Sequence, residues 1–175
     1  MELNEEYIEK LRKKDENAVR IFVREYKIPL YNYIYRIVYN KEDAEDLLQD
    51  TFLKIFKNIN NIDFKRNARA FIFKIARNCC IDFLRKKKKE MPFIEEIYEN
   101  KNDIYERMRL KGKIESALLN LKEEDREIII LKYIENFKIK EISEIMGIQE
   151  NTVKIKIFRA LKKLKSYFSC AGGGI

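Results

Sequence analysis

The last part of the chain carries basic side chains whose spacing suits contact with phosphates. The run QENTVKIKIFRALKKLKSYF has no acidic residue after Glu150. Apolar residues recur through it at helical spacing, which predicts an amphipathic helix with one cationic face. The expected buried stripe is Val153, Ile157, Ala160, Leu161, Leu164 and Phe168, and the expected cationic face is Lys154, Lys156, Arg159, Lys162, Lys163 and Lys165. Electrostatic attraction to a polyanion is the chemistry that such a face can perform.

A shorter helical segment, IKEISEIMG, comes just before this cationic helix and ends at Gly147. A short helix, a glycine turn and a longer cationic helix together predict a helix-turn-helix, whose second helix enters the major groove of DNA. Ile155 falls within the cationic face, where an isoleucine could meet a thymine methyl group. The alternative is a pair of amphipathic helices with no role in DNA binding.

A second basic region lies in the middle of the chain. Residues 63–89 include ten basic and two acidic residues, an excess as large as the +8 net charge of the whole chain. The run ARAFIFKIARNCCIDFLRKKKK predicts a long helix with Ala68, Phe71, Ile72, Ile75, Cys79 and Phe83 in the core. Its other side is expected to carry Arg69, Phe73, Lys74, Arg77, Asn78 and Arg85. Aromatic rings mixed with cations suit unpaired nucleic acid, whereas a solvated basic helix is the plainer interpretation.

An acidic face is predicted on the helix that starts after Asn40. The expected core stripe is Ala44, Leu47, Leu48, Thr51, Phe52, Ile55 and Ile59. The opposite face carries Glu42, Asp43, Asp46, Gln49 and Asp50. Acidic residues near a helix N-terminus interact favourably with the helix dipole, so charge alone explains this cluster as helix stabilisation.

These segments predict an all-α fold of two small helical domains. The chain has 175 residues, 46% of them hydrophobic, with 5 Gly and 2 Pro. The expected domains are residues 1–89 and residues 110–168, the latter with the helix-turn-helix, joined by a flexible acidic linker at residues 90–109 and followed by a mobile tail at 169–175. In the first domain we expect helices at Asn4–Arg12, from Glu16 to just before Pro29, and at Leu30–Val38.

Several function classes are disfavoured by what the sequence contains. It has no His, and its three cysteines, Cys79, Cys80 and Cys170, do not have zinc-ligand spacing, so we expect reduced thiols and no metal. No nucleophile–base pair or Gly-rich phosphate loop is evident, so we expect neither an enzyme nor a cofactor. The charged N-terminus is unlike a signal peptide, and no run approaches the ~20 apolar residues of a membrane span, so we expect a cytoplasmic protein.

With these residues in view, the chain resembles the sigma factors of bacterial RNA polymerase, in the extracytoplasmic-function (ECF) group of the sigma-70 family. DAEDLLQDTFLKIF, residues 43–56, is similar to the helix that docks on the clamp of the polymerase β′ subunit. FIFKIARNCCIDFLR, residues 71–85, resembles the helix that melts the promoter. EISEIMGIQENTVKIKIFRA, residues 141–160, is similar to the reader of the minus-35 element.

The resemblance implies a non-catalytic subunit that directs transcription initiation, and it implies the site residues. Those expected to bind polymerase are Asp43, Asp46, Leu47, Gln49 and Asp50. Those expected at the minus-10 element are Phe64, Lys65, Arg66, Asn67, Phe73, Lys74, Arg77 and Asn78. Those expected at the minus-35 element are Asn151, Thr152, Lys154, Ile155, Lys156 and Arg159, of which Asn151, Thr152 and Lys156 are placed nearer the phosphates.

The partners implied are core RNA polymerase, through the β′ clamp and the β flap, promoter DNA and an anti-sigma factor. Two other functions stay open at this point. A helix-turn-helix regulator would bind duplex DNA without polymerase and would need no basic aromatic helix. A nonspecific nucleic-acid chaperone would account for the charge but not for the glycine turn.

Overall fold

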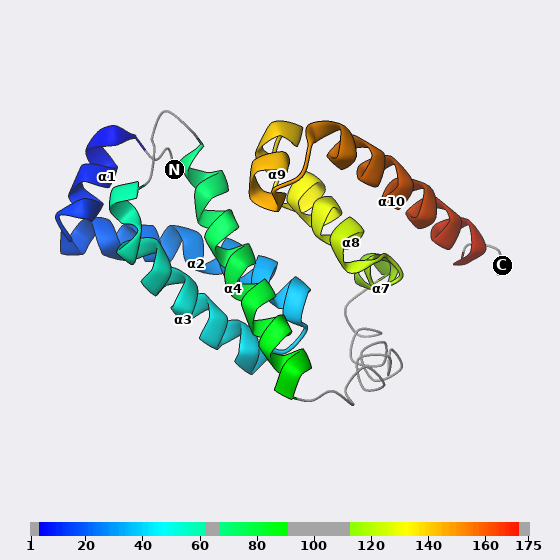
Figure 1. Ribbon diagram of the computed structural model, residues 1–175, viewed down its shortest axis with the longest axis horizontal. Coiled ribbons are helices and arrows are strands. Elements are labelled where there is room, and N and C mark those ends of the chain that lie inside the picture. The colour runs from blue at the N-terminus through cyan, green and yellow to red at the C-terminus, as the bar shows by residue number, and fades with distance from the viewer. Residues whose placement is uncertain (1–3, 62–66, 91–112, 172–175) are drawn as a thin grey trace. The chain divides into compact units, whose positions relative to one another are not determined.

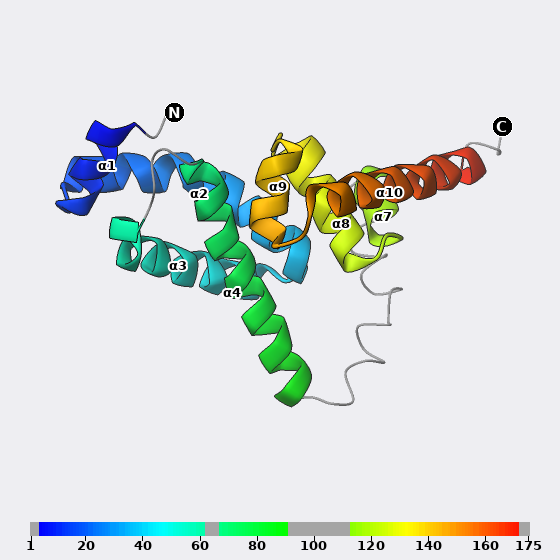
Figure 2. The same cartoon turned by 45° about the horizontal axis from the view of Figure 1, so that its top comes forward.

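A computed structural model describes residues 4–61, 67–90 and 113–171. The chain divides into an N-terminal unit, which holds helices α1 to α4, and a C-terminal unit, which holds α7 to α10 (Figure 1, Figure 2). Within the described ranges every regular element is helical, which confirms the all-α prediction. The linker predicted at residues 90–109 and the tail predicted at 169–175 fall largely outside the described residues.

The N-terminal unit is built from α1 (Glu5–Arg12), α2 (Glu16–Val38), α3 (Lys41–Lys57), a 3₁₀ turn (Ile59–Asn61) and α4 (Ala68–Glu90). Each of the four α-helices follows an Asn or Asp whose side-chain oxygen accepts a hydrogen bond from the backbone N–H three residues later. These residues are Asn4, Asp15, Asn40 and Asn67, with distances of 2.8 to 3.1 Å. Such caps satisfy N–H groups that a helix start leaves unpaired.

Helix α2 runs without a break through Pro29, so the prediction of two helices meeting there is wrong. Proline removes one backbone hydrogen bond and disfavours a helix interior. The side chains on both sides of it nevertheless share one buried face: Tyr26 is 7% exposed, and Leu30 and Tyr33 are fully buried. Burial of this continuous face outweighs the local preference for a break.

Aromatic rings join the helices of the N-terminal unit. The ring of Phe22 on α2 lies 6.2 Å from that of Phe52 and 5.7 Å from that of Phe56, both on α3. Tyr33 on α2 meets Phe73 on α4 edge to face, with centroids 5.2 Å apart. These contacts orient α3 and α4 on α2, and so fix which of their faces remain in solvent.

The C-terminal unit consists of α7 (Lys113–Leu119), α8 (Glu123–Ile129), a π-helical turn (Ile130–Ile134), α9 (Ile139–Met146) and α10 (Glu150–Ala171). Its core is small and mostly aliphatic. Leu118, Leu121, Ile129 and Ala160 form one buried cluster, against which Leu164 packs. The cluster therefore ties the cationic helix α10 to α7 and α8.

The turn between α9 and α10 has the geometry that the sequence predicts. Gly147 ends α9 with φ of 68°, a left-handed conformation that glycine adopts without steric cost. Its N–H and that of Ile148 both donate to the carbonyl of Ser143, and the Ser143 hydroxyl donates to the carbonyl of Ile148 at 2.5 Å. These bonds fix the path of the chain from α9 into α10.

Candidate functional site

Helix α3 places the predicted acidic residues on one exposed face. Asp46, Gln49 and Asp50 are exposed and Asp43 is half-buried. The spacing of three, four and seven residues aligns them along the helix. Leu47 is different, because it is only 6% exposed and packs in the core, so the structure does not place its side chain on this face.

Sequence reasoning missed an apolar residue at the C-terminal end of this face. Leu53 is 69% exposed. It follows Gln49 by four residues and Asp50 by three, so its side chain lies beside theirs. The signal was available, because the predicted core stripe of this helix leaves Leu53 out. We define the acidic docking face as Asp43, Asp46, Gln49, Asp50 and Leu53.

Helix α4 exposes some of the predicted minus-10 residues. Lys74 and Asn78 are exposed and Arg77 is half-buried, spaced as neighbours along one side of the helix. Asn67 is exposed at the start of α4, where its side chain caps the helix by accepting from the N–H of Ala70. The predicted residues Phe64, Lys65 and Arg66 lie outside the described residues.

Phe73 is not part of the exposed side of α4, and its predicted place there is wrong. The side chain is fully buried against Tyr33. The guanidinium of Arg69 lies 5.0 Å from the centroid of its ring. Ala70 and Ala76 are also buried, so the core-facing surface of α4 is wider than the predicted stripe. The Phe73 ring fills core space between α4 and α2, where it meets Tyr33.

Helix α10 presents a cationic surface. Asn151, Lys154 and Arg159 are exposed, Thr152 is half-buried and Ile155 is 51% exposed. Lys162, Lys163 and Lys165 are exposed further along the helix. Within the described ranges no ion pair neutralises any of the exposed lysines of this helix or Arg159. Their charges are therefore available to an anionic ligand.

A second apolar side chain lies on this surface and was also missed. Phe158 is 71% exposed, three residues after Ile155 and four after Lys154. We define the cationic reading face as Asn151, Thr152, Lys154, Ile155, Phe158 and Arg159. Leu161 and Phe168, which the sequence predicts in the core, are partly exposed in the structure, at 40% and 41%. The short helices α7 and α8 bury only one narrow side of α10.

Lys156 departs from the other lysines of α10. Its Nζ lies 2.6 Å from a carboxylate oxygen of Glu124 and 3.5 Å from one of Asp125, both in the first turn of α8. Only 24% of its side chain is exposed. The hydrogen bond to Glu124, followed by the charges of both acids, raises the pKa of Lys156 above its usual value. The charge of Lys156 is thus directed toward α8.

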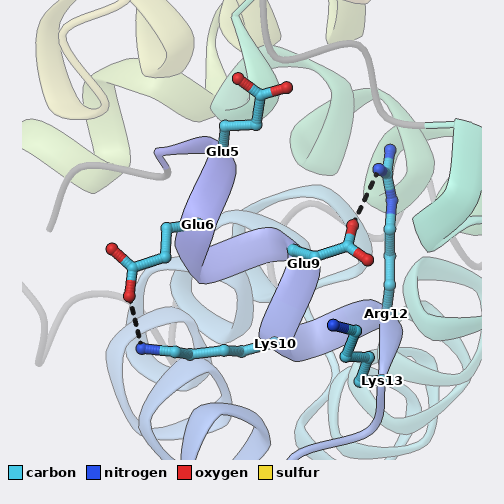
Figure 3. A pocket seen from close by; sticks show the side chains of 6 residues that line it. All are labelled: Glu5, Glu6, Glu9, Lys10, Arg12 and Lys13. Atoms are coloured by element: carbon cyan, nitrogen blue, oxygen red, sulfur yellow. Dashed lines mark hydrogen bonds and ion pairs between the residues drawn. The ribbon is translucent and has the colours of Figure 1, made fainter.

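A shallow pocket on α1 is lined by three acidic and three basic side chains: Glu5, Glu6, Glu9, Lys10, Arg12 and Lys13 (Figure 3). Lys10 pairs with Glu6 at 2.7 Å and Arg12 with Glu9 at 3.4 Å. Because opposite charges on one helix neutralise each other there, this surface offers no strong field to a ligand. Arg12 also donates to the carbonyl of Asn60, which links α1 to the 3₁₀ turn.

Comparison with known proteins matches both units. The family model for Sigma-70 region 2 covers residues 22–90, and that for Sigma-70 region 4 covers residues 111–164. The ECF RNA polymerase sigma factor SigW of Bacillus subtilis is 30% identical over 173 residues, which span 90% of this chain and 92% of that one. The chain belongs to the ECF sigma factors of the sigma-70 family. Its function is to direct RNA polymerase to promoters.

Solved structures share the fold of this sigma factor. CnrH, determined in complex with the cytosolic domain of CnrY, has a TM-score of 0.72 at 22% identity and covers 94% of this chain and 96% of its own. The sigma factor RpoE of Bartonella quintana, determined in complex with the anti-sigma factor NepR, has a TM-score of 0.69 at 22% identity and covers 86% of this chain and 98% of its own. No helix in the described ranges is long and apolar enough to cross a membrane.

Proposed function

We propose that this sigma factor divides its work between its two units and is itself non-catalytic. The N-terminal unit would bind core polymerase and the minus-10 element, and the C-terminal unit would bind the minus-35 element. The observation that carries this proposal is the opposite charge of two exposed helix faces, one in each region matched by the family. The nucleotide chemistry would belong to the polymerase, and the chain would act with it in the cytoplasm.

The acidic docking face of α3 is the proposed contact with the clamp of the β′ subunit. Its carboxylates would attract a basic partner surface, and the exposed Leu53 at the end of the face would add an apolar contact. Carboxylates repel phosphates, so the same face would not compete for DNA. Leu47 would support the face from the core without touching the partner.

The exposed side of α4 is the proposed contact with the minus-10 element. Lys74 and Arg77 would hold phosphates, and Asn78, with amide donors and an acceptor, would bond to the edge of an exposed base. Phe73 would act only as a core residue that orients the helix. Opening the duplex costs a few kcal/mol for each unstacked base, which these contacts and the polymerase would offset.

The cationic reading face of α10 is the proposed contact with the minus-35 element. Lys154 and Arg159 have donors for guanine edges, while Ile155 and Phe158 offer apolar contact to thymine methyl groups or sugars. Asn151 and Thr152, near the start of the helix, would bond to phosphates. Two modules on one chain raise each other's effective concentration, so neither contact needs high affinity alone.

An anti-sigma factor is the proposed regulatory partner, together with the β flap as a second polymerase contact. Support comes from the related RpoE, which was determined with the anti-sigma factor NepR bound. A protein that covers the acidic docking face or the cationic reading face would block initiation. Each face has an exposed apolar residue at which such a partner could bind.

Transcription with purified core RNA polymerase tests the proposed function. We expect the polymerase with the full chain to start RNA synthesis at defined sites on genomic DNA fragments, and core enzyme alone to show none of these starts. Binding should weaken steeply with salt, because phosphate contacts release counterions. A chain that binds duplex DNA but neither binds the core enzyme nor directs starts would instead be a helix-turn-helix regulator.

A further inference from the structure

The ion pairs of Lys156 join two helices that are far apart in sequence. The residue lies on α10, three residues after the buried Val153 and four before the buried Ala160, and so along the packed side of the helix. From there its chain extends to the first turn of α8, where Glu124 lies 2.6 Å and Asp125 3.5 Å from Nζ. The contact spans 32 residues of sequence.

Glu124 is 67% exposed, but burial makes the second pair, between Asp125 and Lys156, different from an ordinary surface pair. Asp125 is 8% exposed. Within the described ranges, Lys156 is the basic residue that forms an ion pair with it. A nearly buried carboxylate is costly unless a cation or hydrogen bonds compensate its lost hydration. The structure therefore favours Lys156 keeping its ammonium at α8 over releasing it to a ligand.

The rotation of α10 about its own axis decides which residues can reach a groove. Ile155 and Arg159 flank Lys156 in sequence, at one and three positions away. The fully buried residues of α10 closest to Lys156, Val153 and Ala160, are small, whereas the larger Ile157 and Leu164 are only half-buried. Small side chains resist rotation of a helix weakly, so a directional ion pair adds a constraint that they do not provide.

We propose that Lys156 is a positioning residue: its ion pairs with Glu124 and Asp125 hold the rotation of α10 so that Ile155 and Arg159 face the bases, and it makes no phosphate contact. This inference rests on the proposed function of α10. It assigns Lys156 a different role from that of Lys154, which belongs to the cationic reading face and has no ion pair in the described part of the chain.

Removing the acidic partners separates the two roles by its effect on discrimination between DNA sequences. If Lys156 contacts phosphate, then freeing it from Glu124 and Asp125 strengthens that contact and leaves discrimination between sequences intact. If it positions α10, the same change loosens the helix and lowers discrimination. The general gain in attraction from two lost negative charges acts on every DNA sequence, so it cancels in a ratio of affinities.

The experiment uses the full chain assembled with core RNA polymerase and a promoter duplex from the transcription test above. Its readouts are the affinity ratio between this duplex and one with a scrambled minus-35 element, and the slope of log affinity against log salt. The variants are Lys156→Gln, the near-isosteric pair Glu124→Gln with Asp125→Asn, and Lys154→Gln as the control for a lysine in the reading face. Amide hydrogen exchange at Val153 and Ala160 reports whether α10 stays folded.

We expect Lys156→Gln and the partner-side pair each to lower the affinity ratio by roughly threefold or more, in line with a partly buried charged contact. We expect the salt slope of Lys156→Gln to match that of the unmodified chain. Lys154→Gln should make the slope shallower by about 0.9, the value for one cation that displaces counterions from the DNA. If Lys156→Gln unfolds α10, the partner-side pair decides by its affinity ratio alone.

A salt slope that becomes shallower by about 0.9 in Lys156→Gln would overturn the inference. An unchanged ratio in the partner-side pair would also overturn it. A polymerase that starts at no defined site with the unmodified chain would instead contradict the proposed function, before any variant is compared.

Discussion

The acidic docking face and the cationic reading face use one arrangement with opposite charge. In each, an exposed apolar side chain lies on the same helix as a run of charges: Leu53 lies at the end of the acidic stripe of α3, three residues after Asp50, and Phe158 lies among the cations of α10. In the proposed division of function, the charge would select the class of partner, and the apolar residue would supply a contact that salt does not screen. Opposite signs would then keep each proposed partner away from the face proposed for the other.

The cores behind the two faces differ more than the faces do. The N-terminal unit packs large rings, with Phe22, Tyr33 and Phe73 all fully buried. The cluster that ties α10 to α7 and α8 is aliphatic and small. We therefore expect the N-terminal unit to depend on single large side chains. The C-terminal unit, in which Phe137 is also fully buried, is expected to depend more on the turn at Gly147 and the ion pairs of Lys156.

The largest effect is expected from Phe73→Ala, which tests the aromatic core. Emptying a fully buried phenylalanine site costs about 3–5 kcal/mol of unfolding free energy. Denaturant unfolding, with amide exchange in α4 as a local readout, measures this loss. Phe73→Leu keeps most of the volume but removes the ring, so it should preserve promoter opening in permanganate footprinting. If a stably folded Phe73→Leu chain failed to open the promoter, Phe73 would have to contact DNA after all.

Reversing a charge on the acidic docking face comes next. Asp50→Arg should lower affinity for core polymerase by about tenfold to a hundredfold, because it places like charges opposite each other. Fluorescence anisotropy of the labelled chain with core enzyme measures the affinity. Glu5→Arg is the matched control, since it makes the same charge change at an exposed site on α1, outside the region 2 match. Equal affinity for Asp50→Arg and the unmodified chain would remove α3 from the interface.

The aromatic core also predicts a loss of stability at high pH. Burial raises the pKa of Tyr26 to about 12. The unfolded chain releases this proton near pH 10, so the contribution of Tyr26 is complete below that pH and is lost as the pH rises toward 12. The loss amounts to about 2–3 kcal/mol. Tyr26→Phe removes this group, so the difference in unfolding free energy between the two chains should change over that range and stay constant below it.

The two exposed apolar residues offer a paired test of the two faces. Truncating an interface apolar side chain costs about 1–2 kcal/mol of binding. Leu53→Ala should therefore weaken binding to core polymerase and leave the minus-35 affinity ratio unchanged, whereas Phe158→Ala should do the reverse. Anisotropy with core enzyme and duplex competition with the assembled polymerase measure the two quantities. A variant that changed both the affinity for core polymerase and the minus-35 affinity ratio would show that the two faces do not act separately.

How far the sequence predicts these features depends on whether local periodicity or packing decides them. The acidic side of α3, the glycine turn at Gly147 and the cationic side of α10 follow from residue spacing. The structure agrees except at Leu47, Lys156, Leu161 and Phe168. The prediction of a helix break at Pro29 is wrong because tertiary burial overrides the local preference of proline. The prediction of an exposed Phe73 is wrong because the buried side of α4 is wider than the predicted stripe. The ion pairs of Lys156 join residues 32 apart, which no helical repeat can show.

The smallest effect is expected at the turn of the helix-turn-helix. A Cβ added at Gly147 would meet no atom within 4 Å, so Gly147→Ala introduces only the strain of a left-handed φ of 68°. That strain costs about 1 kcal/mol. Gly147→Asn should cost less, because asparagine tolerates this conformation better than alanine.

Amide exchange of α9 and α10 measures both costs at Gly147, with α4 in the same samples as the internal reference. The C-terminal unit should lose more protection in Gly147→Ala than in Gly147→Asn, while the protection of α4 should not change. A loss for alanine well above 1 kcal/mol would mean that the turn is held by contacts other than the Ser143 bonds. Equal protection in all three chains would mean that its conformation is not needed to hold α9 against α10.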